Sequence, residues 1–271
     1  MQRIKTAILM AIVMIPILIW GEPYFIFDGF CLLLSIGAAT EYRLMLRKKQ
    51  VLPLWIDVLT IVSTGLFFAT LLAITHYNLH PLYLFIVLMG LVLLYSILMV
   101  FVDTFRPQDF GMTLLMIVYC SVGFSAFAYL RHQGLLMVIY ALAVVMMTDT
   151  AAYFFGVRFG KHKIAPKVSP KKSYEGSIAG LVFGTVVGFI IGYFGNLFGS
   201  DFPIYGYLLI SAFLSTVGQI GDLVASKFKR AYEIKDYSNL FPGHGGILDR
   251  FDSSMFAATF LLFIMIIIQV L

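Results

Sequence analysis

Two adjoining stretches near the C-terminal end decide both the fold and the chemistry of this chain. Residues 203–225 read PIYGYLLISAFLSTVGQIGDLVA, and residues 226–252 continue as SKFKRAYEIKDYSNLFPGHGGILDRFD. The first stretch is apolar and long enough to span a bilayer, which takes about 20 residues. The second stretch packs five cations and four carboxylates into 27 residues. A loop that only joined two membrane spans would need none of these charges.

Apolar runs like the first stretch recur along the whole chain, which is 61% hydrophobic and only 12% charged. Soluble domains carry about 25% charged residues. The composition therefore predicts an all-α, polytopic integral membrane protein. We expect about nine transmembrane helices, at residues 6–20, 24–41, 53–75, 82–102, 111–130, 135–156, 177–199, 203–225 and 251–271. The first run follows Arg3 and Lys5 but is not followed by a small-residue cleavage site, so we expect a retained helix and not a signal peptide.

The placement of positive charge predicts the topology. Alternating nine spans puts 18 of the 19 Lys and Arg residues on one side of the membrane and only Arg131 on the other. Because positive loops favour the cytoplasmic face, we expect a cytoplasmic N-terminus and an outside C-terminus. The net charge of +5 then lies where anionic headgroups are found, and it does not indicate nucleic-acid binding. The compact chain, without added soluble domains, favours a bacterial cell membrane.

The informative residues are unevenly distributed. Residues 1–134 hold about five spans with short connections. Residues 135–271 hold two basic loops, 157–175 and 226–250, and we expect this second part of the chain to form a catalytic transmembrane region. Asp149 lies inside the sixth span, where an ionisable group facing lipid costs about 3 kcal/mol or more. It is therefore expected to face a polar cavity, or else to make a packing hydrogen bond between helices.

The seventh span carries a glycine every four residues, at Gly176, Gly180, Gly184, Gly188 and Gly192. Stripes of small residues let helices pack closely in lipid. The partner could be another span of the same chain or a second subunit, so a homodimer is one expectation.

The loop 157–175 contains six cations, which either anchor the inner face or bind phosphate. Its segment Ser169-Pro170-Lys171-Lys172-Ser173 leads into a helix start, and a helix N-terminus attracts anions. Glu175, in the first turn, favours the same helix dipole or serves as a cap.

The loop 226–250 combines carboxylates with cations, which is what metal-assisted chemistry on phosphates requires. If the preceding helix continues past the membrane edge, Asp222, Ser226, Lys229 and Glu233 share one face. Asp249 and Asp252 are spaced i, i+3 and can point the same way.

The stretch from Ser226 to Asp252 resembles the signature of the phosphatidate cytidylyltransferases, or CDP-diacylglycerol synthases. The matching positions are Ser226, Lys229-Arg230, Lys235-Asp236, Pro242-Gly243-His244-Gly245-Gly246, Asp249-Arg250 and Asp252. Further positions are similar to the family's upstream motifs: Asp149, Ala152, Tyr153, Gly156, Ser169 to Ser173, and Glu175-Gly176. The resemblance covers roughly residues 145–255.

The resemblance implies transfer of CMP from CTP to phosphatidic acid at the cytoplasmic face, with Mg²⁺ as cofactor held by Asp222 and Asp249. We expect catalytic roles for Asp222, Asp249, Lys229, Arg230, His244, Arg250 and Asp252. We expect substrate binding by Lys171, Lys172, Ser173, Glu175, Ser226, Lys235, Asp236, Gly245, Gly246 and Asp149. His244 is left with three readings: a proton donor, a phosphate ligand or a structural turn residue.

Two other classes of protein fit parts of the pattern. A transporter or flippase would carry ionisable groups near the bilayer midplane and two similar halves, whereas here the polar groups cluster at one face. A CTP-dependent polyprenol kinase would phosphorylate an alcohol and release CDP.

Overall fold

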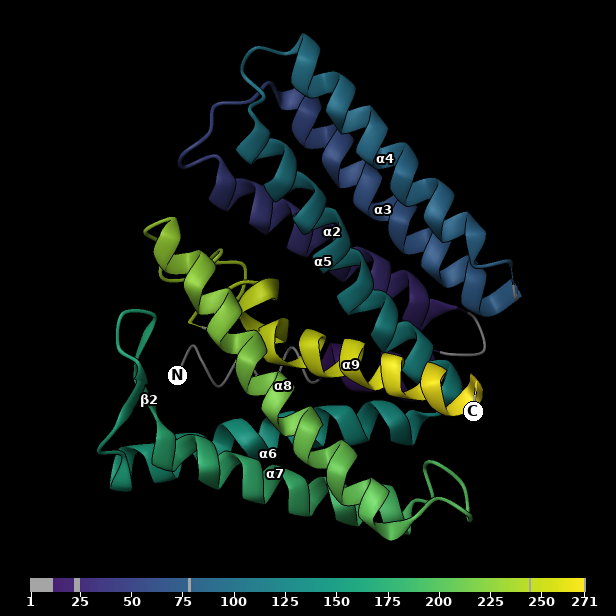
Figure 1. Cartoon of the computed structure of the whole chain (residues 1–271), viewed down its shortest axis with the longest axis vertical. Coiled ribbons are helices and arrows are strands. Elements are labelled where there is room, and N and C mark those ends of the chain that lie inside the picture. The colour runs from purple at the N-terminus through teal and green to yellow at the C-terminus, as the bar shows by residue number, and fades with distance from the viewer. Residues whose placement is uncertain (1–11, 22–24, 78, 244, 271) are drawn as a thin grey trace. The chain divides into compact units, whose positions relative to one another are not determined.

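A computed structural model describes residues 12–21, 25–77, 79–243 and 245–270, and this part of the chain is almost entirely helical (Figure 1). The long helices are α2 (Ile26–Leu46), α3 (Leu54–Tyr77), α4 (Leu82–Phe101), α5 (Pro107–Gln133), α6 (Leu135–Phe159), α7 (Tyr174–Phe194), α8 (Ile204–Ala231) and α9 (Ile247–Val270). All eight are long and apolar enough to cross a membrane. The protein is therefore a polytopic helical membrane protein, as the composition predicted.

The first expected span is only partly covered. Residues 12–20 are helical, whereas the rest of the run 6–20, with Arg3 and Lys5, lies outside the described residues. The count of nine spans and the sides of the two termini thus stay predictions.

The chain forms two compact units, and neither is a single continuous segment. The first unit comprises Met1–Tyr129 and Tyr232–Arg250, and the second comprises Leu130–Ala231 and Phe251–Leu271. Helix α9 therefore begins in the first unit and continues in the second. The expected division at residue 134 was drawn from the distribution of motifs, and it stays a prediction.

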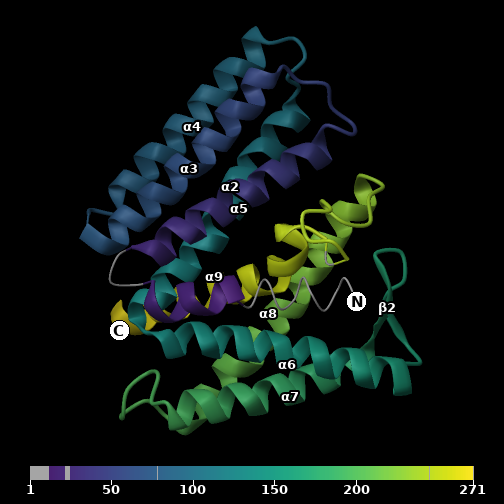
Figure 2. The same cartoon turned by 180° about the vertical axis from the view of Figure 1, so that it is seen from behind.

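In the first unit, α2 packs against α3 and α3 against α4, as both views show (Figures 1 and 2). A cluster that includes Ile56, Phe67, Tyr95 and Ile117 forms its core. Helix α4 buries only Leu91 and Tyr95. The outward apolar surface of α4 suits contact with lipid, which is as apolar as the side chains that it meets.

A buried ion cluster joins α2 to α3. Asp57, which is 5% exposed, forms ion pairs with both Arg43 and Arg47. The expected span ended at residue 41, with both arginines in a loop, but α2 continues to Leu46 and buries Arg43. The helix is longer than predicted because Asp57 neutralises the arginine charge, and a buried charge is tolerated only when it is paired.

In the second unit, α6 and α7 run side by side and α8 packs against both (Figures 1 and 2). The five glycines of the α7 stripe are all buried. A Cβ at Gly180 would lie 2.7 Å from the carbonyl oxygen of Thr148 on α6, and a Cβ at Gly188 would lie 2.6 Å from Ser211 Oγ on α8. The stripe therefore packs within the chain, and it gives no support to the expected homodimer.

The loop between α6 and α7 departs from the all-α expectation. It folds as an antiparallel hairpin of β1 (Lys163–Ala165) and β2 (Ser169–Ser173). Pro166 and Pro170 cannot continue a helix because proline lacks a backbone N–H. The hairpin pairs the backbone polar groups that such a loop would otherwise leave to water.

We expect Gly188→Ala to lower the melting temperature of the purified protein in detergent. The added Cβ would lie 2.6 Å from Ser211 Oγ and 2.7 Å from Val144 Cγ2, and overpacking costs about 1–3 kcal/mol. The matched control is Gly90→Ala on α4, where a Cβ meets nothing within 4 Å. Equal melting temperatures for the two variants would contradict the close packing of α7.

Candidate active site

A cavity of about 540 Å³ opens in the second unit, between the hairpin and the helices α6, α7 and α8. This volume falls in the range of small-molecule sites, about 300–1,000 Å³. Residues singled out in the sequence line the cavity from three elements, α6, β2 and α8: Asp149, Lys171, Lys172, Ser173 and Asp222, together with Gln219. Asp149 is exposed to this cavity, which favours its expected place in a polar cavity over a packing hydrogen bond.

Lys172 and Asp222 meet in the cavity, although the sequence gave them separate roles. Lys172 Nζ lies 2.6 Å from Asp222 Oδ2, and it also donates to the carbonyl oxygen of Gln219 at 3.3 Å. The other carboxylate oxygen of Asp222 accepts a hydrogen bond from Ser226 Oγ at 3.3 Å. The Asp222 carboxylate thus already pairs with a cationic side chain.

The carboxylates of Asp149 and Asp252 interact with the Asp222 carboxylate. Asp149, Asp222 and Asp252 interact electrostatically with one another, and Lys229 offsets part of the charge at Asp252. Asp252 and Lys229 are each 8% exposed. Carboxylate oxygens are the donors that Mg²⁺ prefers, and a divalent cation would offset the mutual repulsion of like charges. A magnesium ion at these carboxylates therefore stays a prediction.

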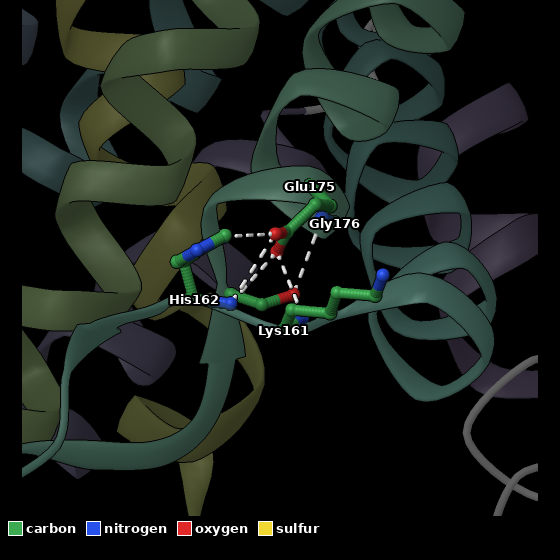
Figure 3. Close-up of polar contacts among 5 residues, drawn as sticks. Lys161, His162, Glu175 and Gly176 are labelled. Carbon is green, nitrogen blue, oxygen red and sulfur yellow. Dashed lines mark hydrogen bonds and ion pairs between the residues drawn. The ribbon is translucent and has the colours of Figure 1, made fainter.

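Glu175 fixes the loop that leads into the hairpin. Its carboxylate accepts hydrogen bonds from Lys161 N and His162 N, both at 3.2 Å, and lies 2.7 Å from His162 Nδ1 (Figure 3). Ser173 caps α7, because its Oγ accepts a hydrogen bond from Gly176 N at 3.3 Å. In the structure, the Glu175 side chain thus bonds to the backbone of the loop. Its expected role in substrate binding stays a prediction.

Helix α8 continues past the apolar run to Ala231, so Asp222, Ser226 and Lys229 share a face as predicted. The prediction that Glu233 extends this face is wrong. Glu233 has a φ of 57° and lies beyond the end of the helix. Arg230 is exposed, and its Nε donates to the carbonyl oxygen of Val168 at 3.3 Å, next to the hairpin turn.

The rest of the signature lies in the first unit. Asp249 is buried, and its Oδ2 accepts hydrogen bonds from Tyr237 N at 2.7 Å and from Gly246 N at 3.0 Å. It therefore holds its own loop, a role that the sequence did not predict. Asp249 and Asp222 belong to different units, so the expected metal pair stays a prediction.

The remaining expected residues of this loop have distinct surroundings. Lys235 and Asp236 are exposed and line a second cavity of about 420 Å³ in the first unit, while Arg250 is exposed. Gly245 has a φ of +80°, which favours glycine. His244 lies outside the described residues.

Two residues of the site were missed in the sequence. The backbone carbonyl oxygen of Gln219 accepts the hydrogen bond from Lys172. The side-chain Nε2 of Gln219 donates to the backbone carbonyl oxygen of Ser177 at 3.3 Å. Glu41 on α2, in the first unit, accepts hydrogen bonds from Ser238, Ile247 and Leu248. Both are polar residues within apolar runs, and that alone was a signal that could have identified them.

Comparison with known proteins decides the family. A model described as the cytidylyltransferase family matches residues 1–268. The chain belongs to this family. The resemblance drawn from residues 145–255 is thereby confirmed, and the match extends to the N-terminal spans, where the motifs gave no signal.

Similar proteins carry a more specific name. A phosphatidate cytidylyltransferase of Bacillus subtilis (strain 168) is 35% identical over 278 residues, which cover 97% of each chain. Phosphatidate cytidylyltransferases of Staphylococcus haemolyticus (strain JCSC1435) and Staphylococcus aureus (strain COL) are 37% and 36% identical over 154 residues, or 57% of this chain and 58% of theirs.

In this cytidylyltransferase family member, we expect Glu175→Ala to speed hydrogen–deuterium exchange at residues 160–173. The variant removes the acceptor of two backbone N–H groups. The control is Glu233→Ala, since the exposed pair of Glu233 with Lys49, 3.7 Å apart, contributes little. Unchanged exchange at residues 160–173 in Glu175→Ala would show that the loop does not depend on this carboxylate.

Proposed function

We propose that the protein is a phosphatidate cytidylyltransferase, which transfers CMP from CTP to phosphatidic acid and gives CDP-diacylglycerol and pyrophosphate for phospholipid biosynthesis. The observation that carries this proposal is the 35% identity to a protein of that name over 97% of both chains. The charged cavity at one end of α6 and α8 supports it independently of any name.

Both substrates carry several negative charges, so their approach costs Coulomb repulsion that the site must offset. Lys171 and Lys172 line the cavity and suit the triphosphate. Lys229, Arg230 and Arg250 suit the lipid phosphate. Lys229 and Arg230 lie at the end of a helix whose first half is largely apolar, where a headgroup lies when its acyl chains stay in the membrane.

Mg²⁺ would be held by Asp222 and Asp249, with Asp252 acting electrostatically on Asp222. When bound, this ion neutralises charge on the triphosphate and on the departing pyrophosphate. The donor chemistry fits, since a carboxylate that draws an ammonium group to 2.6 Å also attracts a metal cation.

The chemical step needs no side-chain nucleophile. An oxygen of the phosphatidic acid phosphate, already ionised at neutral pH, forms a bond to the α-phosphorus of CTP. The bond from that phosphorus to the bridging oxygen of the β-phosphate breaks, and pyrophosphate leaves with the electron pair. The chain's own residues position the two phosphates in line and screen their charge. The cationic loops support a site at the cytoplasmic face of a bacterial cell membrane.

Purified protein supplied with labelled CTP, Mg²⁺ and phosphatidic acid tests the function. We expect pyrophosphate to appear together with a cytidine-bearing lipid. A phosphorylated alcohol together with CDP would identify a polyprenol kinase instead, and the absence of any nucleotide turnover would favour transport.

We expect Asp222→Asn and Asp249→Asn each to lower kcat about 100-fold or more, as loss of a charge that stabilises a transition state does. Asparagine keeps an oxygen that can accept the hydrogen bonds from Tyr237 N and Gly246 N. A loss in Asp249→Asn would therefore point to charge and not to loop structure.

Asp201→Asn is the matched control, because Asp201 is an exposed residue in the connection between α7 and α8. It should leave turnover and melting temperature unchanged. Turnover near that of the wild type in Asp222→Asn or Asp249→Asn would refute a metal role for that residue.

A further inference from the structure

One carboxylate of the first unit bonds to the signature loop from a distant part of the sequence. Glu41 lies on α2, and its side chain is 4% exposed. Its Oε1 accepts hydrogen bonds from Ser238 Oγ at 2.6 Å and from Ile247 N at 2.8 Å. Its Oε2 accepts one from Leu248 N at 2.9 Å. All three donors belong to the segment 237–249, which we name the signature loop.

These contacts supply the N-terminal cap of α9. The first N–H groups of a helix have no partner within the helix, and a carboxylate at this end is favoured by the helix dipole. Helix α9 starts at Ile247, so Glu41 satisfies its first two N–H groups. A buried carboxylate in turn needs such donors, because it is costly to remove from water unpaired. The carboxylate thus satisfies the free N–H groups at the helix start, and these N–H groups stabilise the buried carboxylate.

The glycine turn of the signature loop is shaped around this contact. A Cβ at Gly246 would overlap both carboxylate oxygens of Glu41. The backbone N–H of Gly246 is taken by Asp249 Oδ2 at 3.0 Å. Gly246 therefore allows the Glu41 side chain of α2 to come close to the signature loop. The substrate-binding role expected for Gly246 stays a prediction.

The same loop carries the acidic residue on which the proposed chemistry depends. Asp249 Oδ2 joins Tyr237 N to Gly246 N, and Glu41 joins Ser238 to the two residues that follow Gly246. The two carboxylates hold the two ends of the signature loop together. Without the Glu41 carboxylate, the signature loop that orients Asp249 loses three of these five hydrogen bonds.

We propose that Glu41 is a positioning residue for cytidylyl transfer: it fixes the signature loop and thereby the orientation of the Asp249 carboxylate. This inference rests on the proposed function. Glu41 touches neither substrate. It acts through the loop, so its removal lowers the rate of the chemical step more than it weakens the binding of CTP.

The test is Glu41→Gln, measured by hydrogen–deuterium exchange and by steady-state kinetics per folded molecule. The amide keeps one acceptor oxygen but turns an NH₂ donor towards N–H groups that need an acceptor. We expect faster exchange across residues 237–249 and a 10- to 100-fold lower kcat, since small misplacements in active sites have effects of that order. The KM for CTP should change much less than kcat, because Glu41 acts on the chemical step and not on ground-state binding of CTP.

The matched control is Thr40→Val on the same helix. Thr40 Oγ1 donates to the carbonyl oxygen of Ile36, within α2 itself, at 2.9 Å. It should leave both loop exchange and kcat unchanged. A double variant separates direct from indirect effects: Ser238→Ala should speed loop exchange in the wild type and add nothing in Glu41→Gln.

Several outcomes would overturn the proposal. Unchanged exchange at residues 237–249 in Glu41→Gln would do so, as would an equal loss of kcat in Thr40→Val. A loss of folded protein with normal kcat per folded molecule would reduce Glu41 to a stabilising role. If Glu41→Gln does not accumulate in membranes, Ser238→Ala alone decides, by its effect on loop exchange and kcat. Wild-type protein without CTP turnover would defeat the proposed function, while the exchange comparison would still decide whether Glu41 holds the loop.

Discussion

A carboxylate removed from water in a membrane protein must be offered donors or cations, since its desolvation costs several kcal/mol. Each buried acidic side chain described above meets this constraint in its own way. Asp57 takes two arginines, and Glu41, Asp249 and Asp252 take backbone N–H groups. Asp222, which is only partly buried, takes Lys172. These contacts determine where helices extend, where they start and which loops are held.

The two units use this constraint differently. In the first unit, the Glu41 carboxylate and one oxygen of Asp249 hold a helix start and a turn. In the second unit, Asp149, Asp222 and Asp252 repel one another. Like charges brought together oppose folding, and such arrangements are typical of functional sites. The second unit thus keeps an unfavourable arrangement where the proposed chemistry needs a place for a cation.

Glycine has two separate functions in this protein. Along α7, Gly180 and Gly188 let helix backbones approach one another, which fixes the helix that carries Ser173 and Glu175 at its start. In the signature loop, Gly246 lets a carboxylate reach a helix terminus. In both places glycine allows close packing, and this packing fixes the positions of nearby charged residues.

The sequence by itself determined the helical membrane-protein class, the helix start after Ser173 and the family, because these depend on local hydrophobicity, local hydrogen bonding and motif spacing. It did not determine the hairpin of residues 163–173, the end of α8 before Glu233, or the pairing of Lys172 with Asp222. Glu41 lies 206 residues from Ile247, and no local pattern joins them. Only the tertiary structure decided which side chains meet, because the packing of helices selects partners that the sequence leaves far apart.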